Sequence, residues 1–155
     1  MKPVLFVLGV SALPIALRLR VELGGEVHTP DCVKGGDVTY AKATEHLARL
    51  FKNGRTIIGL CASGILIRAI APHLADKRSE PPVVAVAEDG SSAVPLLGGH
   101  HGANDLARRI AHRHRSRQEP AVFAIGAAQG KEIFPDPALG DAARGGVPGP
   151  RDRGT

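Results

Sequence analysis

The sequence predicts an α/β fold, with a layered, Rossmann-like, mostly parallel sheet that carries one antiparallel hairpin. Short apolar runs rich in valine, isoleucine and leucine alternate with longer segments of helical periodicity. That order is typical of strand–helix units in a parallel sheet. Two of the apolar runs are instead separated only by Glu88-Asp89-Gly90-Ser91, whose composition favours a β-hairpin turn.

The first strand–helix unit occupies the amino-terminal quarter of the chain. Residues 4–10 begin with an unbroken apolar run, as expected for a strand covered by helices on both faces. A helix over 13–23 follows, because Pro14 is tolerated in a first turn and Gly24 stops the helix. Residues 26–29 are expected to form a short second strand.

The middle of the chain repeats this order. Residues 30–37 are expected to form a loop and residues 40–52 a helix ended by Asn53-Gly54. Residues 56–61 are a β-rich apolar strand, and Ser63 is the expected N-cap of the next helix.

The helix expected over residues 64–74 is apolar nearly all round, which predicts burial on more than one side. Its polar side chains are Arg68 and His73. An arginine in such a helix either reaches the surface or pairs with an acidic group, either an acidic ligand or an internal carboxylate such as Asp76 or Glu88.

The last third of the domain is expected to hold the hairpin and a closing helix. Residues 83–87 and 92–97 form the two hairpin strands, and an apolar stripe beginning at Ala103 marks the helix. Residues 121–125 offer a last strand. These patterns predict one α/β domain over residues 1–127 and a disordered, Pro- and Gly-rich tail over 128–155.

Composition narrows the function classes. A net charge of +5 favours anionic partners, but scarce aromatic residues and the absence of a nucleic-acid-binding motif argue against nucleic acid. Two cysteines without metal or disulfide spacing favour a reducing compartment, and we expect the cytoplasm. The start resembles a short signal peptide, but its apolar run divides into a strand and an arginine-bearing helix too short to span a membrane.

A glycine- and histidine-rich element lies between the second hairpin strand and the closing helix. Its members are Gly98, Gly99, His100, His101, Gly102 and Asn104. Glycines allow close backbone approach to a ligand, and paired imidazoles can transfer protons near neutral pH. The alternative is a tight turn whose imidazoles merely cap the helix. No metal site is predicted, because adjacent histidines rarely bind one ion and further ligands are not nearby.

A second glycine-bearing loop follows the strand over 56–61. We expect both loops at the carboxyl edge of the sheet, where each opens a helix and its free N–H groups can bind an anion. Cys61 and Ser63 lack the spacing of hydrolase nucleophiles, so Cys61 is interpreted as a small buried residue. The chain has no nucleotide-binding glycine motif, and we predict no bound cofactor.

Three stretches together, residues 59–72, 76–84 and 94–108, resemble the amino-terminal region of the CbiG family. The resemblance covers roughly residues 4–112 and rests on the ordered trio of motifs. It implies a role in cobalamin biosynthesis as cobalt-precorrin 5A hydrolase, which opens the ring A lactone and releases a two-carbon fragment as acetaldehyde. Cobalt would then arrive within the substrate.

The resemblance also implies site residues. His100 and His101 would be catalytic and would transfer protons during hydrolysis. The residues expected to bind the substrate would be Ser63, Gly64, Arg68, Lys77, Arg78, Gly98, Gly99, Gly102 and Asn104.

The chain departs from the family pattern beyond its closing helix, where family members continue into a middle segment and a carboxyl-terminal domain. CbiG-like regions also occur joined to precorrin-3B C17-methyltransferase. The expected partners are therefore a cobalt-precorrin and either the CbiG carboxyl-terminal domain or a precorrin methyltransferase. Two alternatives are a non-catalytic tetrapyrrole-binding or interaction module that partners such a methyltransferase, and an unrelated anion-binding α/β protein.

Overall fold

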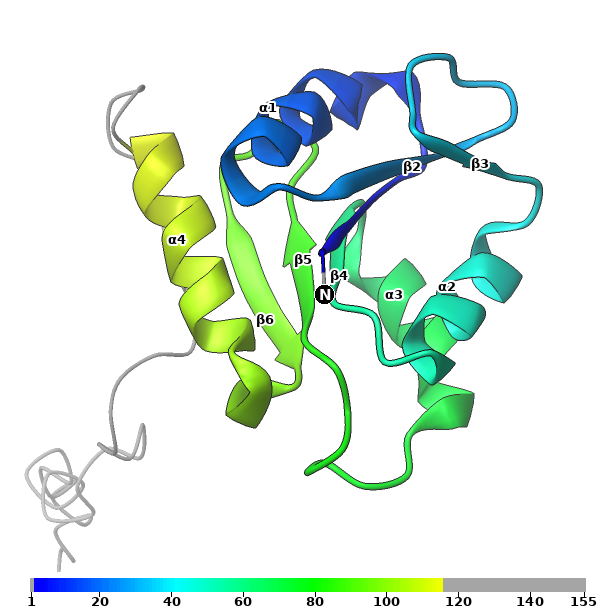
Figure 1. Cartoon of the computed structure of the whole chain (residues 1–155), viewed down its shortest axis with the longest axis vertical. Helices are drawn as coiled ribbons and strands as arrows, with labels where there is room; N and C mark the ends of the chain where they lie inside the picture. Colours follow the sequence, from blue (N-terminus) through cyan, green and yellow to red (C-terminus); the bar gives the residue numbers. More distant parts are fainter. Residues whose placement is uncertain (1, 116–155) are drawn as a thin grey trace, which may run out of the picture.

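The computed structural model describes residues 2–115, which fold into one six-stranded sheet with helices on both faces (Figure 1). The strands are β1 (Val4–Val7), β2 (Glu26–Pro30), β3 (Val38–Tyr40), β4 (Ile57–Leu60), β5 (Val83–Val86) and β6 (Ala93–Leu97). The helices are α1 (Leu13–Leu23), α2 (Ala43–Lys52), α3 (Ser63–Ile70) and α4 (Ala103–Arg115). Three short 3-10 turns are η1 (Val10–Ala12), η2 (Ala71–His73) and η3 (Gly99–His101).

The strand order is β3-β2-β1-β4-β5-β6, with β1 to β5 parallel and β6 antiparallel to β5. This arrangement confirms the predicted mostly parallel sheet with one antiparallel hairpin. We call the edge at which β1, β4 and β5 begin the amino edge, and the edge at which they end the carboxyl edge. Because β6 runs the other way, it begins at the carboxyl edge and ends at the amino edge.

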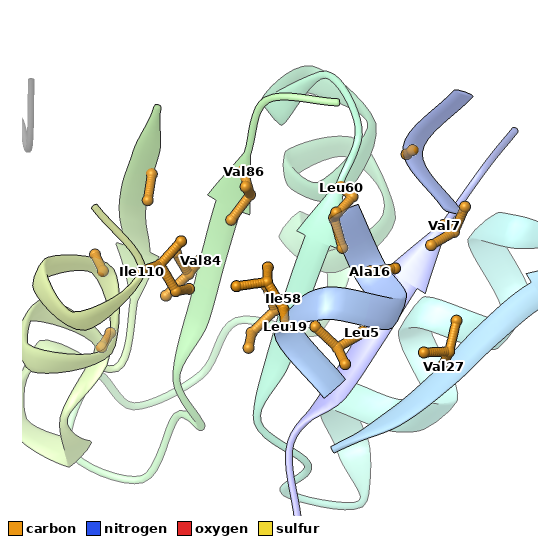
Figure 2. Packing of buried hydrophobic residues seen from close by; sticks show 14 residues of the cluster. Leu5, Val7, Ala16, Leu19, Val27, Ile58, Leu60, Val84, Val86 and Ile110 are labelled. Atoms are coloured by element: carbon orange, nitrogen blue, oxygen red, sulfur yellow. The ribbon is translucent and has the colours of Figure 1, made fainter. Parts of the chain in front are cut away.

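Two hydrophobic clusters hold the helices to the sheet. One joins α1 and α4 to one face, where Leu5 and Val7 of β1 lie close to Ala16 and Leu19 of α1 (Figure 2). The other cluster joins α2 and α3 to the opposite face and includes Phe6 of β1. Because alternate β1 side chains enter opposite clusters, the strand is apolar at every position, as the sequence pattern indicated.

The prediction of a helix from residue 40 was wrong at its start. Residues 38–40 form β3, which pairs with β2, and α2 begins only at Ala43. The buried Tyr40 hydroxyl donates a hydrogen bond to the Val7 carbonyl at 2.6 Å, which holds the tyrosine against the sheet. A three-residue strand is too short to produce a periodic pattern, so helical spacing nearby concealed it.

The prediction that the apolar helix at 64–74 is buried on several sides was also wrong. The α-helix ends at Ile70, and η2 continues through Pro72 to His73. Only one side packs on the sheet, and the side chains of Ile67 and Leu74 remain 52% and 46% exposed.

Residues 2–115 hold no helix that is both long and apolar enough to cross a membrane. The expected strand at 121–125 and tail at 128–155 lie outside the described residues.

Candidate functional site

The turn formed by residues 98–102, which we call the histidine turn, lies at the amino edge of the sheet. Leu97 at the end of β6 pairs with Val83 at the start of β5. A Cβ atom at Gly98 would lie 2.6 Å from backbone atoms of Pro81 and Pro82, which precede β5. The prediction of a shared carboxyl edge for both glycine loops was therefore wrong, because an antiparallel strand delivers its end to the opposite edge.

Backbone geometry fixes the histidine turn in front of α4. Gly98 and Gly102 have φ angles of 71° and 95°, a region that favours glycine. The N–H groups of His101 and Ala103 both donate to the Gly98 carbonyl, at 2.9 and 3.2 Å. The glycines are thus required by a tight turn, which also presents both histidine side chains to solvent.

His101 joins the histidine turn to the loop before β5. Its Nε2 atom donates a hydrogen bond to the Arg78 carbonyl, so Nδ1 is left as an acceptor. The loop is braced by Asp76, whose carboxylate accepts the Arg78 N–H at 3.0 Å and whose carbonyl accepts the Ser79 N–H at 2.9 Å. The fold thereby brings the backbone of Arg78, and the loop that carries Lys77, to His101.

His100 differs from His101 in its contacts. The described part of the chain provides no hydrogen-bond partner for its exposed side chain. Within the same element, the amide nitrogen of Asn104 lies 3.4 Å from the position that a Cβ at Gly99 would take. His101 thus contacts the loop before β5, whereas the His100 side chain faces solvent.

An open groove runs along the amino edge beside the histidine turn. Its walls come from the residues before β1, β4 and β5 and from the start of α4: Pro3, Leu23, Thr56, Pro82, His101, Gly102, Asp105, Leu106 and Arg109. Lys77 and Arg78 belong to the loop that His101 holds. The edge therefore combines cationic side chains with imidazoles, a chemistry suited to binding carboxylates and transferring protons.

The remaining predicted site residues, Ser63, Gly64 and Arg68, lie at the opposite edge. Ser63 is the first residue of α3 rather than its N-cap, because Ala62 takes the cap position and no side chain caps the helix. The guanidinium of Arg68 turns back to within 3.3 Å of the position of a Gly64 Cβ. The sheet thus separates these three residues from the histidine turn.

Arg68 reaches the surface instead of pairing internally. Its two expected partners have other contacts, since Asp76 accepts the Arg78 N–H and Glu88 accepts the Ser11 hydroxyl at 2.6 Å. Arg68 is exposed, and no ion pair within the described residues includes it.

The Ser63 loop borders the topological switch point, the place between β1 and β4 where the strand order reverses. Ligands of open α/β sheets commonly bind at the carboxyl edge there. Cys61 directly follows β4, and burial raises the pKa of its thiol to about 11. The Cys61 side chain is buried, which confirms its interpretation as a small buried residue.

A family model described as "Cobalamin synthesis G N-terminal" matches residues 45–122, half of the chain. The chain belongs to this family. Both the histidine turn and the loop that His101 holds lie inside the matched region of this CbiG N-terminal chain.

Two curated relatives are similar over shorter stretches. The chain is 38% identical over 66 residues to a cobalt-precorrin-5A hydrolase of Priestia megaterium, and the match covers 42% of this chain and 18% of the relative. It is 42% identical over 62 residues to the cobalt-precorrin-5A hydrolase of Salmonella typhimurium, covering 39% and 18%. The matched stretches thus span less than a fifth of each relative's length.

A solved structure shares the fold. The crystal structure of a cobalamin biosynthesis protein G homolog from Sulfolobus solfataricus matches with a TM-score of 0.55 and 21% identity. The match covers 72% of the CbiG N-terminal chain and 33% of the other chain.

Sequence reasoning missed a buried histidine pair in the CbiG N-terminal chain. The Nδ1 atom of His28 lies 2.7 Å from Nε2 of His46, and Arg49 donates to His46 Nδ1 at 2.8 Å. Burial, together with the nearby His28 and Arg49, lowers the pKa of His46 to about 4. Each histidine occupies an ordinary strand or helix position, so no local motif marks the pair; His46 lies inside the family match and His28 outside it.

The described residues hold no group of three or more His, Cys, Asp or Glu side chains that could bind a metal ion.

Proposed function

We propose that the chain is a precorrin-binding domain of cobalamin biosynthesis that contributes to lactone hydrolysis of cobalt-precorrin 5A, with release of acetaldehyde. The observation that carries this proposal is the contact of His101 with the Arg78 carbonyl. It joins imidazoles to a cationic loop inside the region that the family model matches. Two relatives named cobalt-precorrin-5A hydrolase support the choice of reaction.

The proposed substrate matches the chemistry of the amino edge. A precorrin carries many acetate and propionate groups, which suit the ammonium of Lys77 and the guanidinium groups of Arg78 and Arg109. Gly99 and Gly102 keep the outer side of the histidine turn free of side chains that would hold a flat ligand away, Gly98 lets the turn approach Pro81 and Pro82, and Asn104 offers an amide. In the proposed reaction, cobalt is present only as part of the substrate.

The histidines supply the proton transfers that hydrolysis needs. Water attacks the lactone carbonyl, and a base must take its proton as the ring C–O bond breaks and the freed oxygen is protonated. His100 has an unengaged side chain, and His101 keeps Nδ1 as an acceptor while its Nε2–H is held by the Arg78 carbonyl. We therefore assign the base to one of these two residues and the returning acid to the other.

Ser63, Gly64 and Arg68 do not enter this site, because they lie at the carboxyl edge. We therefore assign them no part in binding the substrate at the histidine turn.

The short match with the relatives supports a second candidate function. The matched stretches cover 18% of each hydrolase, and the expected macromolecular partners, a CbiG carboxyl-terminal domain or a precorrin methyltransferase, remain part of the proposal. In the second candidate the chain binds a tetrapyrrole or such a partner and contributes no catalytic group. The cytoplasm remains the predicted compartment, on the basis of the two unpaired cysteines.

Titration with cobalt-precorrin 5A, followed by visible absorption and by assay of released acetaldehyde, tests both candidates. It is run on the chain alone and mixed with the remainder of the Priestia megaterium relative. His100→Ala and His101→Ala are compared with His112→Ala, a change of another exposed histidine in α4.

Loss of acetaldehyde release in the first two variants only, with binding retained in His100→Ala, supports the hydrolase. Binding without release under both conditions supports the binding module. Absence of binding contradicts the hydrolase and the tetrapyrrole-binding module.

A further inference from the structure

The face of the sheet that carries α2 and α3 is left uncovered beside β6. A groove there, which we call the β6 groove, is lined by Ile67, Ile70, Leu74, Val83, Leu96 and Leu97. Ile67 and Leu74 expose about half of their side-chain surface to solvent. Apolar surface of this kind commonly marks an interaction site.

The outer edge of β6 is open as well. Among the described residues β6 pairs only with β5, and α4 packs on these two strands from the opposite face (Figure 1). An open edge presents unpaired backbone N–H and C=O groups that readily accept another strand. The β6 groove and the open edge adjoin, so one added strand would cover both.

The end of α4 points to a segment of this chain as that strand. β6 ends at the amino edge, so α4 begins there and returns toward the edge at which β6 begins. A segment following α4 would therefore start level with the start of β6. The sequence continues through residues 116–120 to the apolar run Ala-Val-Phe-Ala-Ile at 121–125, which lies outside the described residues.

The handedness rule favours the same placement. The unit β1-α1-β2 steps sideways from β1 to β2 with α1 on the face that α4 also covers. β6 runs in the opposite direction to β1, so a step away from β5 beneath α4 gives a crossover of the same hand. Crossovers between parallel strands are right-handed in nearly all proteins, and a connection of about five residues is an ordinary length.

We propose that residues 121–125 dock along the open edge of β6, parallel to it, and cover the β6 groove. Alternation along a strand divides the segment into Ala121, Phe123 and Ile125 on one face and Val122 and Ala124 on the other. The larger set fits the groove, and the smaller set faces α4. The family model supports this reading, because its match continues to residue 122, past the end of α4.

Hydrogen–deuterium exchange of the full chain tests the proposal. Phe123→Asp is compared with Phe134→Asp, which places the same charge outside the docking segment, and with Phe123→Leu, which keeps an apolar side chain. We expect Phe123→Asp to speed exchange of the residue 93–97 amides at least about tenfold, because an edge strand that loses its partner opens more easily. The two control variants should leave exchange unchanged, and an equal effect of both aspartates or of neither would overturn the proposal.

A cross-link separates this occupant from others. In a Cys32→Ser background, Ile67→Cys with Phe123→Cys should form an intramolecular disulfide under mild oxidation, whereas Ile67→Cys with Phe134→Cys should not. A disulfide that joins two chains would identify a second copy as the occupant and would overturn the proposal. Failure of the intended link, together with unchanged exchange in Phe123→Asp, would leave the groove to another protein and would equally overturn it.

Discussion

His28 Nδ1 and His46 Nε2 lie 2.7 Å apart where β2 meets α2, and their contact fixes the tautomers of both rings. Arg49 can only donate, so Nδ1 of His46 accepts and its Nε2 carries the proton. That proton is donated to Nδ1 of His28, whose Nε2–H then faces the Glu26 carboxylate at 3.7 Å without a hydrogen bond. The pair is thus neutral and directional.

Because the buried histidine pair is neutral, we expect the folded chain to lose stability in acid. Burial lowers the pKa of both rings, that of His46 to about 4, whereas the unfolded rings titrate near 6.5. Between these values the unfolded chain binds more protons, so the free energy of unfolding falls as pH drops from about 6.5 toward 4, at up to about 1.4 kcal/mol per pH unit for each ring. Urea unfolding at several pH values measures this slope.

His46→Gln removes one titrating ring, and we expect a shallower slope over that range. The control is His112→Gln, which changes an exposed histidine. Equal slopes for His46→Gln and the unchanged chain would contradict the assignment of the acid sensitivity to the pair.

The turn glycines predict a graded loss of stability. Gly98 and Gly102 both have positive φ, but a Cβ at Gly98 would lie 2.6 Å from Pro81 and Pro82, whereas one at Gly102 would have open space. We expect Gly102→Ala to lower the free energy of unfolding by about 1 kcal/mol from backbone strain. Gly98→Ala should lower it by about 1–3 kcal/mol more. Equal unfolding midpoints in urea would refute the close approach at Gly98.

His101 should order the loop before β5. We expect His101→Ala to speed amide exchange of residues 76–81, because the loop loses its hydrogen bond from the imidazole to the Arg78 carbonyl. His100→Ala removes a neighbouring imidazole without that contact and should leave exchange of the loop unchanged. If the two variants behave alike, His101 does not hold the loop.

The two edges of the sheet should respond differently to loss of charge. A Lys77→Ala, Arg78→Ala double variant should weaken binding of cobalt-precorrin 5A several-fold and flatten its dependence on salt. Arg68→Ala removes an equally exposed cation at the opposite edge and should leave both quantities unchanged. Greater weakening in Arg68→Ala would move the binding site to the carboxyl edge.

The sequence pattern predicted most of the sheet because β1, β4 and β5 are buried on both faces and are therefore continuously apolar. The composition of the turn between β5 and β6 also predicted the hairpin. The sequence pattern did not indicate that the reversed strand places Gly98 at the amino edge, opposite to the loop at Ser63. A local pattern does not show at which edge a loop will lie.

Long-range pairing explains the other misses. β3 is three residues long and is held by its partner strand and by the Tyr40 hydroxyl, which contacts Val7 across 33 positions of the chain. His28 and His46 meet only when α2 packs on β2. The glycines and histidines themselves marked the histidine turn in the sequence, but the contact between His101 and Arg78 is set by the fold.

The most direct test of the proposed site is an amide-exchange footprint of cobalt-precorrin 5A on the full chain. We expect protection of residues 76–82 and 98–105 at the amino edge, with no change at residues 8–11 and 61–64. Protection confined to the carboxyl edge, around Ser63 and Gly64, would contradict the assignment of the histidine turn as the site that holds the substrate.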